Sequence, residues 1–273
     1  MYGLGSYPGS KSRLGAQILG RLPKTAFDWY IEPFCGNAPF MRSKFRSYID
    51  PDKTNVWLND KCTDVFSVLQ GVRQKPNDAI ISDVLLRVNR CLKGKVQSEC
   101  NRAMSDLRKG SSPAAFLLLT RLAVRSVVRR SRTKICTPSL SEIDRRLKPL
   151  NKTRLIEAVA TAEKVQKVSN WDFRRVFDTL PDNSVSFIDP PYWTGSGHDW
   201  YEHSFSHRDH HDLHDRLAAL DVSRHRFIMS LDINTLSRSL YWRDKRFFCL
   251  TLPVTYGCGM KTQEFLVANY PIS

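Results

Sequence analysis

The chain has 273 residues, long enough for one large domain or two small ones, and its 41% apolar and 25% charged residues exclude disorder throughout. Its net charge is +15, and residues 73–164 alone hold 21 Lys or Arg and 8 Asp or Glu. Nearly all of the positive excess therefore lies in one third of the sequence. A charge block of this kind predicts a polyanionic partner, with a solvated basic face as the alternative.

The remaining composition argues against secretion and membrane insertion. No apolar run approaches the ~20 residues that a membrane span needs, and residues 1–11 lack the apolar stretch of a signal peptide. The cysteines are odd in number and form no CxxC pair, which indicates reduced thiols rather than a disulfide framework or a zinc ribbon. They are Cys35, Cys62, Cys91, Cys100, Cys136, Cys249 and Cys258. We therefore expect a cytoplasmic protein.

The apolar pattern predicts strands and helices that alternate on both sides of a helical block. Strands are expected at residues 28–34, 56–58, 184–188 and 226–231, with a terminal pair at 247–256 and 264–270. Helices are expected at 64–73, 79–92, 114–130 and 207–220. Such alternation predicts an α/β fold with a mostly parallel sheet covered on both faces. Residues 1–72 and 165–273 then form one α/β domain, and residues 73–164 form a basic helical insertion.

The expected helix at 114–130 carries arginines at a spacing of four residues. Arg121, Arg125 and Arg129 would lie along one stripe of this helix, opposite its apolar face. A basic stripe on a docked helix suits contact with phosphates, and a solvated helix face is the alternative. The basic residues that follow, Arg130, Arg132 and Lys134, extend the predicted contact with phosphates.

Three short motifs predict a ligand site at the ends of the first strands. Tyr7-Pro-Gly-Ser-Lys11 is a polar turn whose lysine and aromatic ring can hold an anion and stack on a ring. Residues 32–40 (EPFCGNAPF) follow the first strand, and small residues there let backbone N–H groups approach a ligand. Asp60 ends the second strand, where a carboxylate can bind the ribose hydroxyls of an adenosine-type cofactor.

The sharpest motif is Asp189-Pro190-Pro191-Tyr192, directly after the apolar strand 184–188. Two prolines fix the backbone, so the carbonyl and carboxylate of Asp189 and the following aromatic ring have defined directions. A carboxylate and a fixed carbonyl can accept both hydrogens of a planar exocyclic amine while an aromatic face stacks on its ring. The motif therefore predicts a site for a planar ring that carries an exocyclic amine.

Taken together and in this order, the motifs resemble the Dam family of DNA adenine-N6 methyltransferases. Tyr7 to Lys11 resembles the family's N-terminal aromatic-x-Gly-Gly-Lys segment, and residues 32–40 resemble its FxGxG cofactor loop, with Ser10 and Ala38 in place of two glycines. Asp60 and Asp64 resemble the acidic motif after the second strand, and residues 170–173 (NWDF) resemble the Asp-Phe motif before the catalytic strand. Asp189 to Tyr192 is the family's catalytic tetrapeptide, and residues 201–213 and 264–270 match its C-terminal pattern.

The resemblance implies a Rossmann-like methyltransferase sheet that uses S-adenosylmethionine, with the helical block as target-recognition domain. The expected cofactor residues are Tyr7, Lys11, Glu32, Pro33, Phe34, Cys35, Gly36, Asn37, Asp60, Asp172, Phe173 and Asp189. The expected catalytic residues are Asp189, Pro190, Pro191 and Tyr192. The substrate would be an adenine flipped out of double-stranded DNA, because its amine is otherwise inside the duplex. A monomer or weak dimer that requires neither membrane nor metal is expected.

Three other functions remain open at this point. Six histidines lie between residues 198 and 214, and with neighbouring aspartates they are compatible with a metal-dependent nuclease. A non-catalytic nucleic-acid-binding relative would keep the basic block and lose the cofactor site. RNA is the third alternative, as the substrate of an adenine methyltransferase.

Overall fold

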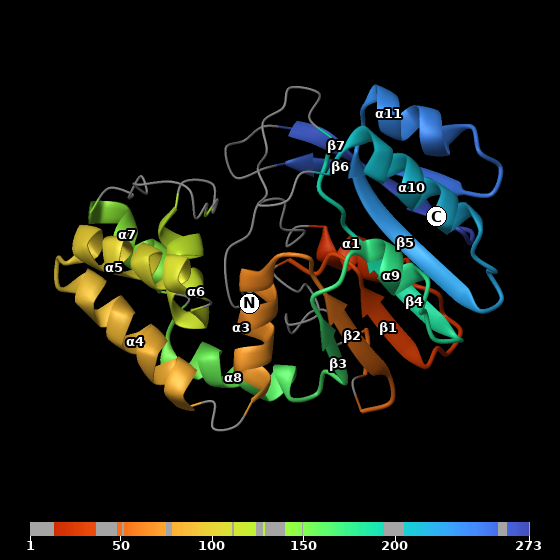
Figure 1. Cartoon of the computed structure of the whole chain (residues 1–273). Coiled ribbons are helices and arrows are strands. Elements are labelled where there is room, and N and C mark those ends of the chain that lie inside the picture. The colour runs from red at the N-terminus through yellow and green to blue at the C-terminus, as the bar shows by residue number, and fades with distance from the viewer. Residues whose placement is uncertain are drawn as a thin grey trace.

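The computed structural model describes residues 14–36, 48–50, 52–74, 78–110, 112–123, 128, 140–148, 150–193, 205–255 and 261–272. In this part of the chain a seven-stranded sheet lies beside a block of helices (Figure 1). The strands are β1 (Trp29–Glu32), β2 (Asn55–Asn59), β3 (Lys167–Ser169), β4 (Ser184–Ile188), β5 (His225–Asp232), β6 (Phe248–Thr255) and β7 (Lys261–Ala268).

The sheet has the order β3-β2-β1-β4-β5-β7-β6. The first five strands in space are parallel, and β7 pairs antiparallel with both β5 and β6. The chain runs outward in one direction from β1 to β3 and in the other from β4 to β5. The topological switch point therefore lies between β1 and β4, where open α/β sheets bind ligands at the carboxyl ends of their strands.

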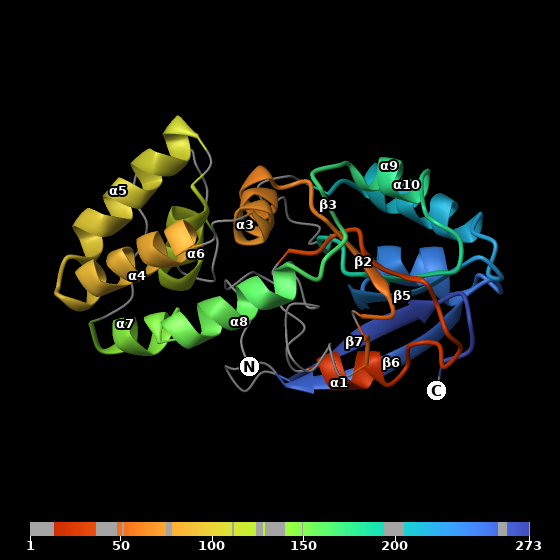
Figure 2. The ribbon, with the colours of Figure 1, turned by 90° about the horizontal axis from the view of Figure 1, so that it is seen from below.

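Helices cover both faces of the sheet, as the sequence predicts (Figure 2). The helices outside the block are α1 (Gly15–Leu19), α3 (Thr63–Arg73), α9 (Phe173–Phe177), α10 (His207–Ala218) and α11 (Thr235–Ser237), followed by the π-helical turn η3 (Arg238–Trp242). Side chains alternate between the two faces along β5, where Ile228 joins one apolar cluster while Phe227 and Met229 join the other. This alternation gives the fold a core on each side of the sheet.

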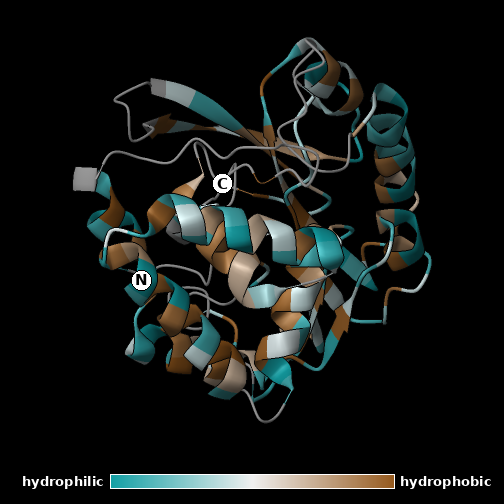
Figure 3. Ribbon diagram, turned by 60° about the vertical axis from the view of Figure 1, so that its left-hand side comes forward, coloured by the Kyte–Doolittle hydropathy of each residue, from teal (hydrophilic) through white to brown (hydrophobic). Residues whose placement is uncertain are grey.

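The helical block comprises α4 (Asp78–Leu92), α5 (Val96–Lys109), α6 (Pro113–Leu122), α7 (Leu140–Leu147) and α8 (Lys152–Ala162). Its helices carry both hydrophobic and hydrophilic residues along their lengths (Figure 3). The block packs on α3, and a Cβ added at Gly71 of α3 would lie 3.3 Å from Pro113 Cγ, so glycine permits this close approach. One apolar cluster runs from Val84 and Leu118 in the block to Leu58 and Leu266 in the sheet.

A buried ion cluster joins α4 to α5 inside the block. The Arg87 guanidinium contacts Asp83 at 3.0 Å, Glu99 at 3.0 Å and Asp106 at 2.7 Å. Arg87 and Glu99 are both buried, and the carboxylates around Arg87 raise its pKa despite the opposing effect of burial. These acids neutralise a buried cation, so the block's positive excess belongs to its other basic residues.

The helix expected at 114–130 is shorter than predicted. It ends at Leu122, because Ala123 has an extended backbone with ψ of 144°. Helix α6 packs against α3, α4, α5 and α7, and every residue from Ala114 to Leu122 is buried. Arg121 therefore lies in the interior, rather than on the exposed stripe that its spacing predicted. The other predicted DNA contacts, Arg125, Arg129, Arg130, Arg132 and Lys134, lie outside the described residues.

Candidate active site

The segments that follow β1 and β4 lie side by side at the switch point of the sheet. Strands β1 and β4 are paired in parallel, with Ile31 opposite Ser186. The chain leaves β1 through Pro33 to Gly36 and leaves β4 through the tetrapeptide that begins at Asp189. The sheet thus brings together two motifs more than 150 residues apart in sequence.

The turn after β1 is held by hydrogen bonds to residues at the end of β2. Gly36 N–H donates to Asp60 Oδ2 at 2.7 Å, and Cys35 N–H donates to the Asn59 carbonyl at 2.8 Å. Gly36 has a φ of +44°, a left-handed conformation that glycine adopts without steric cost. Before the turn, the buried Glu32 accepts a hydrogen bond from the Tyr30 hydroxyl at 2.9 Å.

Asp60 links this turn to the following helix. Its other carboxylate oxygen, Oδ1, accepts from Cys62 N–H at 2.8 Å, directly before α3 begins. One carboxylate therefore fixes both the turn after β1 and the backbone at the start of α3. This is a structural task that the sequence did not assign to Asp60.

Asn59 is a buried residue whose side chain makes several hydrogen bonds, and the sequence analysis did not single it out. Its amide donates to the carbonyls of Pro33 at 2.8 Å and Trp171 at 3.0 Å, and its oxygen accepts from Ser169 and from Trp171 N–H. Asn59 thereby ties the ends of β1, β2 and β3 together. An amide beside the acidic motif is a weak signal in one sequence, because polar residues commonly end strands.

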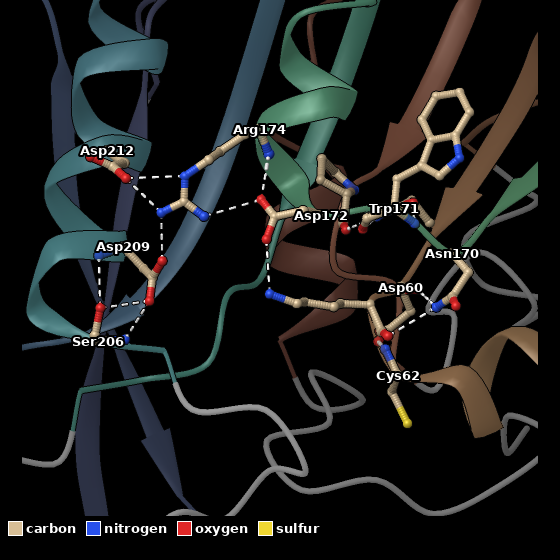
Figure 4. A network of polar contacts seen from close by, with 12 residues as sticks. Asp60, Cys62, Asn170, Trp171, Asp172, Arg174, Ser206, Asp209 and Asp212 are labelled. Atoms are coloured by element: carbon tan, nitrogen blue, oxygen red, sulfur yellow. Dashed lines mark hydrogen bonds and ion pairs between the residues drawn. The ribbon is translucent and has the colours of Figure 1, made fainter.

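A polar network runs along this edge of the sheet to α10 (Figure 4). Asp172 caps α9 by accepting from Arg174 N–H at 3.1 Å, and it also accepts from Lys61 at 2.9 Å. The Arg174 guanidinium extends the network, because its Nη2 donates to Asp209 Oδ1 at 2.6 Å and to Asp212 Oδ2 at 2.5 Å. Although burial opposes the shift, hydrogen bonds from Lys61 and Arg174 lower the pKa of Asp172, which keeps the carboxylate charged.

An aromatic cluster lies beside the polar network. The ring centroid of Phe34 is 5.5 Å from Phe173 and 5.6 Å from Phe205, and Phe173 is 5.4 Å from Phe205. His210 contacts Phe205 edge-on at 4.7 Å, and its buried Nε2 has no hydrogen-bond partner among the residues that the structure describes. Burial lowers the pKa of His210 to about 4, so its imidazole is neutral at pH 7.

The tetrapeptide after β4 combines a half-buried carboxylate with a half-buried aromatic ring. Asp189 and Tyr192 are both partly exposed, and Pro190 is buried between them. The Tyr192 hydroxyl donates to Glu264 Oε1 on β7. Burial raises the pKa of Tyr192 well above its ordinary value, and the charges of Asp189 and Glu264 raise it further. The ring therefore stays neutral, with its hydroxyl as a donor.

The structure places most of the predicted cofactor and catalytic residues along this one edge. They are Glu32, Pro33, Phe34, Cys35, Gly36, Asp60, Asp172, Phe173 and Asp189 to Tyr192. Tyr7, Lys11 and Asn37 lie outside the described residues, so their predicted contacts stay predictions. Beyond Asn59, sequence reasoning missed Arg174 and Phe205, whose partners lie on segments distant in sequence.

The histidines of α10 contact aromatic, histidine or acidic side chains. His207 and His211 lie 4.7 Å apart, ring to ring, and His214 contacts Asp215 and Asp244. Among the described residues, no group of three His, Cys, Asp or Glu side chains is placed to hold a metal ion. In the same part of the chain, no helix is long and apolar enough to cross a membrane.

The solved structures that match this chain include two of low sequence identity. TrmN from Thermus thermophilus has a TM-score of 0.42 and 14% identity over 92% of this chain, which spans only 47% of the TrmN chain. The rRNA methyltransferase aviRa from Streptomyces viridochromogenes has a TM-score of 0.39 and 15% identity, over 96% of this chain and 85% of that one. No curated protein matches the chain significantly.

Comparison with protein families gives a match over most of the chain. The family profile described as "D12 class N6 adenine-specific DNA methyltransferase" matches residues 7–248. This span includes the turn after β1, the acidic motif after β2 and the tetrapeptide after β4. The chain therefore belongs to the D12 class of N6 adenine-specific DNA methyltransferases, whose methyl donor is S-adenosylmethionine.

Proposed function

We propose that the protein methylates the exocyclic N6 amine of an adenine that is flipped out of double-stranded DNA at a specific sequence. The observation that carries this proposal is the position of Asp189 to Tyr192, at the carboxyl end of β4 and directly beside the turn after β1. The basic excess of residues 73–164 supports a polyanionic substrate.

The described residues suit S-adenosylmethionine at the end of β1. Gly36 has a left-handed backbone at the turn, and the rings of Phe34, Phe173 and Phe205 lie beside it. His210 Nε2, which has no hydrogen-bond partner in the described part of the chain, places a neutral, buried hydrogen-bonding group next to these rings. Aromatic rings with one unsatisfied polar group suit a planar nucleobase, because the ligand completes the missing hydrogen bond.

Asp189 and Tyr192 then act on the target base. When bound, S-adenosylmethionine supplies an electrophilic methyl group. The Asp189 carboxylate and the Pro190 carbonyl accept the two N–H bonds of the target amine, which directs its lone pair away from them. Tyr192 stacks on the adenine ring and excludes water from one face. Positioning and electrostatics of this kind lower the barrier without covalent chemistry by the protein.

The helical block is proposed to recognise the DNA around the target adenine. It packs against α3, on the side of the sheet where β3 lies (Figure 1). Arg121 takes no part in this proposal because it is buried. The phosphate contacts are assigned to Arg125, Arg129, Arg130, Arg132 and Lys134, on the basis of their positive charge alone.

The Asp189→Ala variant tests the catalytic assignment. Transfer of labelled methyl groups to unmethylated duplex DNA should fall by about 10²–10³-fold or more, because the target amine loses a charged acceptor. DNA binding should stay within about threefold, since phosphate contacts supply most of the affinity. Asp182→Ala is the matched control, because exposed Asp182 precedes the opposite end of the same strand and pairs with Arg224. Unchanged turnover in Asp189→Ala would refute the assigned role.

A further inference from the structure

Strand β7 carries a buried carboxylate close to the predicted catalytic motif. Glu264 is only 1% exposed and lies opposite Asp232, the last residue of β5. Because β7 runs antiparallel to β5, this position lies at the same sheet edge as the carboxyl ends of β4 and β5. Glu264 is therefore buried beneath the site, although it belongs to the far C-terminal hairpin.

Two hydroxyl groups converge on one oxygen of Glu264. Tyr192 Oη donates to Oε1, and Ser230 Oγ donates to the same oxygen at 2.7 Å. Ser230 is fully buried within β5, between β4 and β7. These contacts connect the segment after β4 to β5 and β7. In sequence, Ser230 lies 34 residues and Tyr192 lies 72 residues before Glu264.

We propose that Glu264, supported by Ser230, is a positioning residue that fixes the ring plane of Tyr192 so that the ring can stack on the target adenine. This inference rests on the proposed function. The orientation of a tyrosine ring depends on two side-chain torsions. A hydrogen bond at the hydroxyl holds the far end of the ring, so the face near the reacting base keeps one orientation.

The protonation state of Tyr192 agrees with its role as hydrogen-bond donor to Glu264. Tyr192 keeps its proton because burial and the charges of Asp189 and Glu264 disfavour the phenolate. A neutral hydroxyl donates to a carboxylate, and a bond to a charged acceptor is stronger than one between neutral groups. A buried carboxylate is costly unless it is hydrogen-bonded, whereas an apolar side chain would fill the same position without that cost. The hydrogen bonds that Glu264 accepts from the Tyr192 and Ser230 hydroxyls offset the cost of burying its carboxylate.

The test compares Glu264→Ala, Glu264→Gln, Ser230→Ala and Tyr192→Phe in steady-state methylation of unmethylated duplex DNA. Glu264→Ala and Tyr192→Phe should each lower kcat by about 10- to 100-fold, because a misplaced ring loses the reactive alignment. The KM for S-adenosylmethionine should change less than about threefold. Glu264→Gln keeps an acceptor oxygen and should retain most of the activity, and Ser230→Ala should have an intermediate effect. Combining Tyr192→Phe with Glu264→Ala should add little to either single loss.

Tyr270→Phe is the matched control. Its hydroxyl donates to the Arg21 carbonyl at 3.1 Å, so the variant removes one partly buried tyrosine hydrogen bond away from the motif. Its kcat should equal that of the wild type. If Glu264→Ala does not fold, Tyr192→Phe still tests the proposal, because it keeps the stacking ring and removes only the anchored hydroxyl.

Base stacking itself has a spectroscopic readout. In a duplex with 2-aminopurine at the mapped target adenine, the wild type should flip the base and quench its fluorescence by stacking. Glu264→Ala should flip the base and leave it brighter. Unchanged kcat and fluorescence in both Glu264→Ala and Tyr192→Phe would overturn the positioning role while wild-type methylation upholds the proposed function. Wild-type protein that methylates no DNA would overturn the proposed function, and the positioning role with it.

Discussion

Replacement of Asp60 should weaken cofactor binding more than its partial exposure suggests. Its two carboxylate oxygens accept separately from Gly36 N–H at 2.7 Å and Cys62 N–H at 2.8 Å. In Asp60→Ala both donors lose their acceptor, and the turn after β1 is released from the start of α3. Asp60→Asn should be nearly as harmful, because its amide nitrogen must face one of the two N–H donors.

The magnitude follows from these two bonds. A hydrogen bond to a charged group contributes about 1.5–3 kcal/mol, so the pair contributes roughly 3–6 kcal/mol when both are made. Because Asp60 is partly exposed, hydrogen bonds to water replace part of this contribution in the variant. If about half of the contribution is lost from the cofactor complex, binding weakens by about 1.5–3 kcal/mol, which is roughly a 10- to 150-fold rise in Kd.

Isothermal titration with S-adenosylmethionine measures this Kd directly. Asp221→Ala is the matched control, because Asp221 accepts from Ser223 N–H at 2.9 Å in an exposed turn before β5, at the opposite edge of the sheet. The control should bind the cofactor like the wild type. A wild-type Kd in Asp60→Ala, with an unchanged circular dichroism spectrum, would refute the role of Asp60 in organising the turn.

The other predictions concern stability and DNA contact. Arg87→Met should lower the free energy of unfolding in urea by about 3–5 kcal/mol, because the side chain of Glu99 is 2% exposed and loses a close cation. A loss under about 1 kcal/mol would contradict a buried ion cluster. His210 has a folded pKa of about 4, below its ordinary 6.5, so the unfolded chain binds the proton first and stability falls as the pH drops from 6.5 to 4. His210→Phe should remove about 3 kcal/mol of that acid-dependent loss in parallel melts, and identical pH dependence would refute the buried neutral imidazole. Arg125→Ala combined with Arg129→Ala should weaken DNA binding and flatten the salt slope by about 1.8, and an unchanged slope would show that neither side chain contacts phosphate.

Strand positions were the most predictable part of the fold. The strand expected at residues 184–188 is β4 without any shift, because an apolar run there is bounded by Asn183 in a left-handed conformation and by Pro190. Prolines cannot continue a sheet ladder, so they mark the strand end and the motif position together. The main prediction, an α/β sheet with the tetrapeptide at a strand end, is confirmed for this reason.

Residue periodicity was less informative for the central helix of the block. The spacing of Arg121 and Arg125 suggested one exposed stripe, yet α6 ends at Leu122 and is surrounded by other helices. Periodicity cannot reveal a helix that is covered on all sides, since its partners are set by tertiary packing. The valines at 124, 127 and 128 also lower helix propensity beyond the observed end.

Contacts between distant segments could not be predicted from one sequence. Arg174 meets Asp209 and Asp212 more than 30 residues away, and Tyr192 meets Glu264 across 72 residues. Each partner is an ordinary polar residue in its local context. Only the strand order, with β7 inserted beside β5, places Glu264 beneath the tetrapeptide.

The most direct test of the central claim is the identity of the methylated product. The protein is incubated with isotopically labelled S-adenosylmethionine and equal amounts of unmethylated duplex DNA and RNA, and the digested nucleosides are identified by mass spectrometry. The account predicts label in N6-methyldeoxyadenosine, and at least about 10²–10³-fold slower labelling of that product with Asp189→Ala. Label confined to RNA, to another position of the base or to cytosine would contradict it.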